Sequence, residues 1–441
     1  MQVFNNLYIR IRVSSDVSLN RFKQFPRLMW ILLFGSFITR GSFYMVWPFL
    51  AVILYEKFAL TATQVGLILS TAAIISVLVS FVGSALSDRI GRHQLMYASG
   101  ILYIISFSLL AEVDSINGYT IVISLCSIAT ALWRPLVSAL IGDIISETET
   151  RELAMQSLYF VVNVGCAIGP MLGVWLGLTG QQSSFYITAG AFAFLLVILY
   201  WGFHQHDVAV DKQNKKLVEN GNLNKVKVDL KSSGTSMAKI LAVLKEDKLF
   251  QCLIFANILC MFIYGQMDSS LIQYLTRAQV PNFLELISSL IFANALVIIS
   301  TQFILLRLMS HLTLITRIQI GLLLLACSQL WLAVNPLTLF WGWIGAIIVM
   351  SLAEAILFPT MNVHIDRLAP QHLRGVYFGA SSFYEFGFAF APLGGGIILD
   401  NFGGFWLFAT GAFISLFVIY LYAILNSLPR PDFDESEAQM R

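Results

Sequence analysis

The sequence predicts an all-α membrane protein in which twelve transmembrane helices form two six-helix bundles around a central cavity. The composition, twelve long apolar runs and a polar segment between the sixth and seventh runs predict this class. Of the 441 residues, 57% are hydrophobic and 12% are charged. Soluble domains have about 45–50% apolar and about 25% charged residues. A water-soluble fold of this length is therefore excluded.

Each apolar run is long enough to cross the hydrocarbon core, which takes about 20 residues in a helix. Lipid offers the backbone no hydrogen-bond partners, so a spanning segment must be a helix or part of a closed barrel. Barrel strands would alternate in polarity over about ten residues, and these runs are continuous. We expect spans at residues 28–54, 64–87, 94–112, 118–142, 155–178, 184–203, 249–274, 283–306, 317–335, 338–362, 375–399 and 403–427.

The polar stretch at residues 204–236 is rich in Lys and Asn and is too long for an ordinary connection between helices. It divides the chain into parts that we take as separate structural units. We expect a basic N-terminal tail (1–27), a first six-helix bundle (28–203), a linker (204–248), a second bundle (249–427) and a C-terminal tail (428–441).

The basic residues predict the orientation in the membrane, because Lys and Arg in short loops mark the cytoplasmic side. With twelve spans, 23 of the 27 Lys and Arg residues fall on the side of both termini. Lys57 and Arg277 fall on the other side, and Arg40 and Arg134 fall within spans. We expect a multi-pass protein of the inner (cell) membrane with both termini in the cytoplasm.

This topology makes a first testable prediction. Single cysteines placed at Asn220 and Asp434 should react only with a reagent supplied from the cytoplasm. A cysteine at Ser115 should react only from outside. Reaction of residue 220 with an impermeant reagent outside intact cells would contradict the twelve-span topology.

The two halves also resemble each other. Pro135, Asp143, Arg151 and the pair at residues 169–170 recur in the second half as Pro359, Asp366, Arg374 and the pair at 391–392, at separations of 222 to 224 residues. Such a parallel repeat of six-helix units is typical of transporters, with the substrate site between the halves near the bilayer midplane.

The loop between the second and third spans reads SALSDRIGRH at residues 84–93. It resembles the loop signature of the major facilitator superfamily, Gly-x-Leu-Ala/Ser-Asp-Arg-x-Gly-Arg-Arg/Lys, and departs from it at Ser84 and His93. The resemblance covers about residues 28–427. It implies that Asp88, Arg89, Gly91 and Arg92 form a cytoplasmic gate that latches the outward-facing state.

Two further residues near the cytoplasmic ends of the spans, Asp143 and Arg151, either belong to this gate or are ordinary solvated loop charges. The resemblance implies that the gate contacts are charge pairs and a contact with a helix terminus. These contacts would break when the transporter switches state.

The fifth span carries GCAIGPMLG at residues 165–173. Gly165, Gly169, Pro170 and Gly173 resemble the Gly-x-x-x-Gly-Pro-x-x-Gly-Gly signature of antiporters in that superfamily, with Val174 in place of the final Gly. The alternative is close packing of helices, which small residues at this spacing also favour. AEAILFP at residues 353–359 points to the twelve-helix drug:proton antiporters, although their Arg-containing signature in span four is missing.

Three acids lie inside predicted spans, where an ionisable residue is costly and therefore a functional candidate. Glu354 lies in span ten, Asp268 in span seven and Glu385 among aromatic residues in span eleven. Burial favours the neutral form of a carboxyl group, which suits reversible proton binding. Each acid is a candidate for binding protons or a cationic substrate. The alternative is a neutral, hydrogen-bonded carboxyl group for Glu354, an aqueous position at the gate for Asp268, and a pair with an arginine of another span for Glu385.

Two arginines share the membrane interior with these acids. Arg40 lies in the middle of span one and Arg134 next to Pro135 in span four. Each is a candidate for substrate binding or coupling, or for a structural pair, and Arg134 could satisfy carbonyls freed by the proline. Aromatic residues in the spans either line a cavity for amphipathic compounds or only pack; they include Trp47, Trp133, Tyr264, Tyr274, Phe378 and Tyr384.

We therefore expect a secondary active transporter that works by alternating access, with proton-coupled export of a small amphipathic compound as its function. A proton-coupled importer of a sugar, peptide or anion is the first alternative, and a non-transporting receptor or assembly protein is the second. We expect no enzyme activity, catalytic residues, metal, cofactor or nucleic-acid partner. The expected driving force is the proton gradient, the partners are the small molecule, protons and lipid, and the chain is expected to be monomeric.

Overall fold

The structure is a computed structural model of the chain and describes residues 22–145, 147–219, 247–369 and 380–430, with Lys245 and Tyr377. Some side chains within these ranges lie outside the description, namely those of residues 81–89, 134–135, 148–149, 152, 206–219, 303, 306 and 366.

The described residues form helices joined by short loops. The first span is divided at Pro48 into α3, the 3-10 turn η1 (Trp47–Phe49) and α4, because proline cannot continue the hydrogen bonding of the preceding helix. The helices are α3 (Arg27–Val46), α4 (Leu50–Phe58), α5 (Ala62–Ile90), α6 (Arg92–Glu112), α7 (Ile116–Ile144), α8 (Thr148–Trp175), α9 (Phe185–Glu219), α11 (Lys248–Gly265), α12 (Ser270–Arg277), α13 (Phe283–Leu308), α14 (Leu314–Val334), α15 (Phe340–Leu368), α17 (Glu385–Phe402) and α18 (Gly404–Ile424).

The predicted number of spans is confirmed. Within the described residues, 12 segments are long and apolar enough to cross a membrane, from Arg27–Phe58 to Gly404–Ser427. Their bounds agree with the expected ranges to within a few residues at most ends. The number of spans could be predicted because each apolar run must match the thickness of the hydrocarbon core, which gives the runs a regular length.

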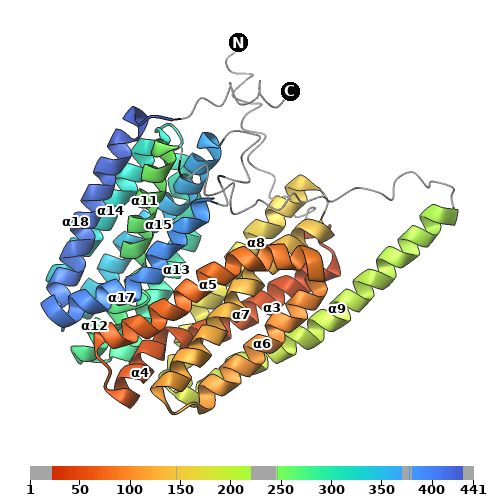
Figure 1. Cartoon of the computed structure of the whole chain (residues 1–441), viewed down its shortest axis with the longest axis horizontal. Coiled ribbons are helices and arrows are strands. Elements are labelled where there is room, and N and C mark those ends of the chain that lie inside the picture. Colours follow the sequence, from red (N-terminus) through yellow and green to blue (C-terminus); the bar gives the residue numbers. More distant parts are fainter. Residues whose placement is uncertain are drawn as a thin grey trace, which may run out of the picture.

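The helices pack into two bundles, as the sequence predicts (Figure 1). One buried apolar cluster draws its residues from Phe25 to Phe203, in α3 to α9 and the turn before α3. A second cluster draws nearly all of its residues from α11 to α18. We call the side where α3 begins and α18 ends the terminal face, and the other side the opposite face (Figure 1).

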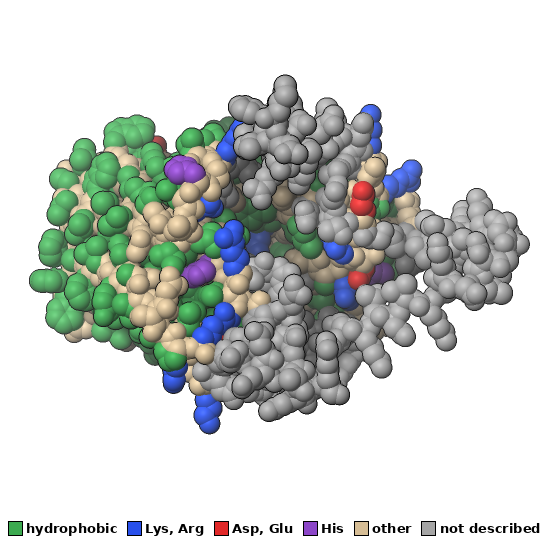
Figure 2. Space-filling model, turned by 90° about the horizontal axis from the view of Figure 1, so that it is seen from above, with side chains coloured by type: hydrophobic (Ala, Val, Ile, Leu, Met, Phe, Trp, Pro, Cys, Tyr) green, Lys and Arg blue, Asp and Glu red, His purple; other side chains and the backbone are tan. Residues whose placement is uncertain are grey.

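The two bundles contact each other chiefly through α5 against α17 and α8 against α13. At the opposite face Phe49 and Val52 of the first bundle are buried in the apolar cluster of the second. Figure 2 looks onto the terminal face and shows a hollow between the bundles, with Lys and Arg side chains around it. The described structure is therefore open at the terminal face and closed at the opposite face.

The glycines of the antiporter-like motif pack against α3. A Cβ atom added at Gly169 would lie 2.2 Å from the carbonyl oxygen of Gly41, and one at Gly165 would lie 2.9 Å from that of Phe37. A Cβ atom at Gly173 would lie 2.7 Å from the side chain of Met45. This stripe lets two helix backbones approach closely, as in other membrane helix pairs, and Pro170 lies inside α8 beside it.

Gly169→Ala should therefore destabilise the first bundle. The added methyl group meets main-chain atoms of α3 that cannot move independently, and overpacking of this kind costs about 1–3 kcal/mol. Gly190→Ala in α9 is the control, because no atom lies within 4 Å of its added Cβ. Thermal unfolding of the purified variants should show a lower midpoint for Gly169→Ala alone. Equal midpoints would show that α3 and α8 separate freely.

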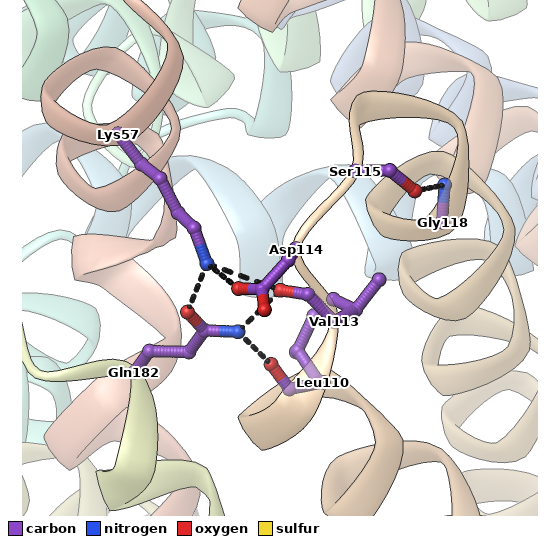
Figure 3. A network of polar contacts seen from close by, with 7 residues as sticks. All are labelled: Lys57, Leu110, Val113, Asp114, Ser115, Gly118 and Gln182. Atoms are coloured by element: carbon purple, nitrogen blue, oxygen red, sulfur yellow. Dashed lines mark hydrogen bonds and ion pairs between the residues drawn. The ribbon is translucent and has the colours of Figure 1, made fainter.

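A polar network joins the end of α4, the end of α6 and the turn before α9 at the opposite face of the first bundle (Figure 3). The Lys57 ammonium pairs with Asp114 and donates to Gln182 Oε1 at 2.7 Å. Gln182 Nε2 in turn donates to the carbonyl oxygens of Leu110 and Val113, at 3.0 and 2.6 Å. These contacts join the ends of α4 and α6 to the start of the sixth span, so they hold the opposite-face end of this bundle together.

A second network holds together the terminal-face end of the second bundle. Asp247, 1% exposed, caps α11 by accepting from the Phe250 N–H at 2.9 Å. Its other oxygen accepts from the Tyr377 hydroxyl at 2.6 Å and from Arg430 Nε at 3.1 Å. Burial and the neighbouring Asp247 raise the pKa of Tyr377, so this hydroxyl remains a donor at neutral pH. The network fixes the chain after α18 to the start of α11.

Candidate functional site

Glu354 lies at the centre of a polar cluster contributed by three helices of the second bundle. Its Oε2 atom accepts from the Tyr264 hydroxyl of α11 and, at 2.8 Å, from Asn294 Nδ2 of α13. The same amide nitrogen lies 3.0 Å from Ser351 Oγ, one turn before Glu354 on α15. The ring of Phe358 stands edge-on to that of Tyr264, with centroids 5.0 Å apart. The cluster therefore combines one acid, two donors and an aromatic wall.

The cluster lies close to the first bundle. α13, which supplies Asn294, packs against α8 of the first bundle. No described Lys or Arg forms an ion pair with Glu354. Two neutral donors reduce the cost of an ionised carboxylate in the membrane interior but do not neutralise its charge. The geometry therefore suits an acid that gains and loses a proton.

Asp268 lies where the seventh span is not helical. α11 ends at Gly265 and α12 begins at Ser270, and the intervening residues form a turn. Asp268 is exposed in this turn. An ionised Asp268 would repel an ionised Glu354. The predicted acid is thus placed near Glu354, in a break of the helix that its apolar pattern did not indicate.

The other candidates are placed differently. Arg40 is half-buried on α3, with its guanidinium carbon 5.8 Å from the centroid of the Phe43 ring, and its stem lies beside Gly165. Glu385 is half-buried at the start of α17, which packs against α5 and α11. Arg134 belongs to α7, but its side chain lies outside the described residues. Of the five intramembrane candidates, Glu354 is the one that the described contacts place in a polar cluster, and an ionised Asp268 lies close enough to repel its charge.

The loop signature joins α5 to α6. Gly91 has φ = 99°, a conformation that side-chain-bearing residues rarely adopt, which explains the glycine at this turn. Arg92 donates to the Ala139 carbonyl oxygen at 2.7 Å and pairs with Asp143 at 2.5 Å, and so joins α6 to α7. Arg151 is half-buried near the start of α8. The side chains of Asp88 and Arg89, in the last turn of α5, lie outside the described residues.

A separate cavity of about 300 Å³ opens at the opposite face, between the loops that precede α13 and α15. Glu285 is its one acidic lining residue. It does not include Glu354 or Asp268, so we do not place the candidate site there.

Sequence reasoning missed Asn294 and Ser351 because it weighed charged and aromatic residues within the spans, and not amides or hydroxyl groups. An amide in the apolar stretch around residue 294 is a weaker but readable signal, since a polar group in lipid needs a partner. Tyr264 was one of several aromatic candidates, and the structure places it in direct contact with Glu354. Trp133, another of them, packs inside the first bundle against Phe192, with centroids 5.5 Å apart.

Comparisons with known proteins agree on the family. The model of the Major Facilitator Superfamily matches residues 32–385. The chain is 25% identical to the uncharacterized MFS-type transporter YqjV of Bacillus subtilis, over 87% of this chain and 89% of that protein. It is 24% identical to a Na(+), Li(+), K(+)/H(+) antiporter of Planococcus maritimus, over 88% of this chain and 97% of that protein.

A shorter similarity reaches a named efflux pump. The chain is 29% identical to the multi-drug resistance efflux pump PmrA of Streptococcus pneumoniae, over 41% of this chain and 45% of the pump. Among solved structures, a POT family transporter in complex with 5-aminolevulinic acid superposes with a TM-score of 0.72 at 17% identity, over 91% of this chain and 96% of that one. At that identity the superposition supports the fold.

Proposed function

Because the chain belongs to the Major Facilitator Superfamily, we propose that it exports a small amphipathic compound across the cell membrane in exchange for protons. Membership makes it a multi-pass membrane transporter and not an enzyme, as the sequence predicts. Export, proton coupling and the class of compound are our proposal. We also propose that the terminal face is cytoplasmic, as the basic residues indicate.

One observation carries the proposal. Glu354 lies in the membrane interior beside the first bundle, with two neutral donors and no described cation as partner. A permanently ionised carboxylate there would be costly, and a proton removes that cost. Binding and release of a proton at Glu354 would change the charge between the bundles. A compound that binds when the proton leaves is then exchanged for it.

Coupling requires that proton and compound favour different states of the transporter. Asp268 and the aromatic wall of Tyr264 and Phe358 offer negative charge and apolar surface close to Glu354. This combination favours compounds that are amphipathic and carry a positive charge. The named antiporter and efflux pump support exchange and export in relatives of this chain.

Proteoliposomes with an imposed pH gradient test the proposal. Cationic amphipathic dyes, sugars, peptides and alkali cations are supplied in turn, and a pH-sensitive dye reports proton movement. We expect a cationic amphipathic compound to move against the direction of the protons. Movement of compound and protons in the same direction would show a symporter, and would contradict the proposal in favour of an importer.

A further inference from the structure

α5 and α17 run antiparallel across the boundary between the bundles, and at the opposite face their backbones touch. A Cβ atom added at Gly66 would lie 2.1 Å from the Pro392 carbonyl oxygen, and one at Gly396 would lie 2.4 Å from that of Ala62. Ser70, 1% exposed, accepts from the Leu393 N–H at 3.0 Å. At this helix pair, main-chain atoms and small residues make the contact between the two bundles.

The N-terminus of α5 is capped from both bundles. Thr61 Oγ1 accepts from the Gln64 N–H at 3.2 Å, and Gln64 Oε1 accepts from the Thr61 N–H at 2.9 Å, which is a capping box within the first bundle. The N–H groups of Ala62 and Thr63 remain without a helical partner. Both donate to Asp400 of α17, at 2.9 Å to Oδ1 and 2.7 Å to Oδ2.

The charge of Asp400 is well placed for this contact. A carboxylate at a helix N-terminus is stabilised by the free N–H groups and by the positive end of the helix dipole. Arg277 of the second bundle lies beside it, donates to the Leu60 carbonyl oxygen at 2.8 Å and lies 4.5 Å from the centroid of the Tyr55 ring. Both residues of the second bundle therefore hold the segment that leads into α5.

We propose that Asp400 is the latch of the opposite face: it holds the state that is open at the terminal face, and it must release α5 whenever the opposite face opens. The capping box stays within the first bundle, so α5 remains a helix after release. Release breaks the two charge-assisted hydrogen bonds that the N-terminus of α5 donates to Asp400. The inference depends on alternating access and not on the compound or the coupling ion.

The same helix pair carries an acid at its other end. Asp88 lies in the last turn of α5, as Asp400 lies in the last turn of α17. Because the helices are antiparallel, the two acids lie at opposite faces. The loop signature implies that Asp88 latches the outward-facing state. Asp400 is then its counterpart for the inward-facing state, and one helix pair alternates between two latches.

The test measures access to Ser70 from the opposite face. The full chain with Ser70→Cys is expressed in whole cells, and an impermeant maleimide is added outside. Mass spectrometry of the peptide that contains residue 70 gives the rate of modification. Adding Asp400→Ala should raise this rate on the order of tenfold, as expected when the free N–H groups at a helix N-terminus lose a charged acceptor. Asp400→Asn, which keeps one acceptor oxygen, should raise it less. Asp88→Asn should lower it.

Asp114→Ala is the matched control, because this acid of the opposite face pairs with Lys57 inside one bundle. It should leave the rate at residue 70 unchanged. Unchanged rates in folded Asp400→Ala and Asp400→Asn would overturn the latch. An equal rise with Asp114→Ala would also overturn it, because general loosening would then explain the access. A rise with Asp88→Asn would overturn the alternation of the two latches.

Discussion

Glu354→Gln is expected to abolish uphill transport driven by a pH gradient while the compound still equilibrates downhill. The glutamine side chain keeps the shape of the site and an oxygen that can accept from Tyr264 and Asn294. It cannot bind and release a proton. Alternating access itself needs no titration at this residue, so exchange in the absence of a gradient should continue. Flux in proteoliposomes with a pH gradient measures uphill transport, and flux without the gradient measures downhill exchange.

Glu285→Gln is the control for this experiment, because Glu285 lies in the first turn of α13 at the opposite face, outside the polar cluster. It should transport uphill like the parent protein. Near-normal uphill flux in Glu354→Gln would remove Glu354 from the coupling scheme. The corresponding amide substitutions at Asp268 and Glu385 would then be tested in the same way.

Gly66→Ala should slow turnover strongly without unfolding either bundle. The added methyl group meets the main chain of residues 392 and 393, and none of these atoms belongs to a flexible side chain. The clash lies between bundles, so it opposes closure of the opposite face and leaves the packing inside each bundle intact. We expect transport to fall at least about tenfold, since overpacking costs about 1–3 kcal/mol.

Gly66→Ala should unfold at the same temperature as the parent protein, unlike Gly169→Ala. Both substitutions place a methyl group about 2 Å from a carbonyl oxygen, but only Gly169 faces a helix of its own bundle. Gly190→Ala again serves as the control. Normal flux in Gly66→Ala would mean that the opposite face closes without contact between α5 and α17.

Much of the candidate site was readable from the sequence, because an ionisable residue in a twenty-residue apolar run has no local explanation. Glu354 and Asp268 stand out for that reason. Their partners do not, because an amide or hydroxyl in a membrane helix often bonds to its own backbone, as Ser351 does to Ile347. Only the packing of α11, α13 and α15 shows that Tyr264 and Asn294 meet Glu354.

The Asp400 latch at the opposite face shows most clearly the difference between what the sequence indicates and what the structure adds. In the sequence, Asp400 is a polar residue in the short connection between the last two spans. Its partners are backbone N–H groups more than 330 positions earlier, which carry no side-chain pattern. The small residues 66 and 396 likewise predict close helix packing, but the sequence does not indicate which helix they contact.

The sequence by itself determined the membrane class, the number of spans, the two bundles, the superfamily resemblance and the isolated acids. These follow from free energies that act residue by residue, above all the cost of polar groups in lipid and the length needed to cross it. Tertiary structure alone decided which groups meet: the donors to Glu354, the helix break at Asp268, the glycine contacts and the capping of α5 by Asp400. Such contacts depend on how helices distant in the chain are rotated and inclined against each other, which is determined by the packing of the whole molecule.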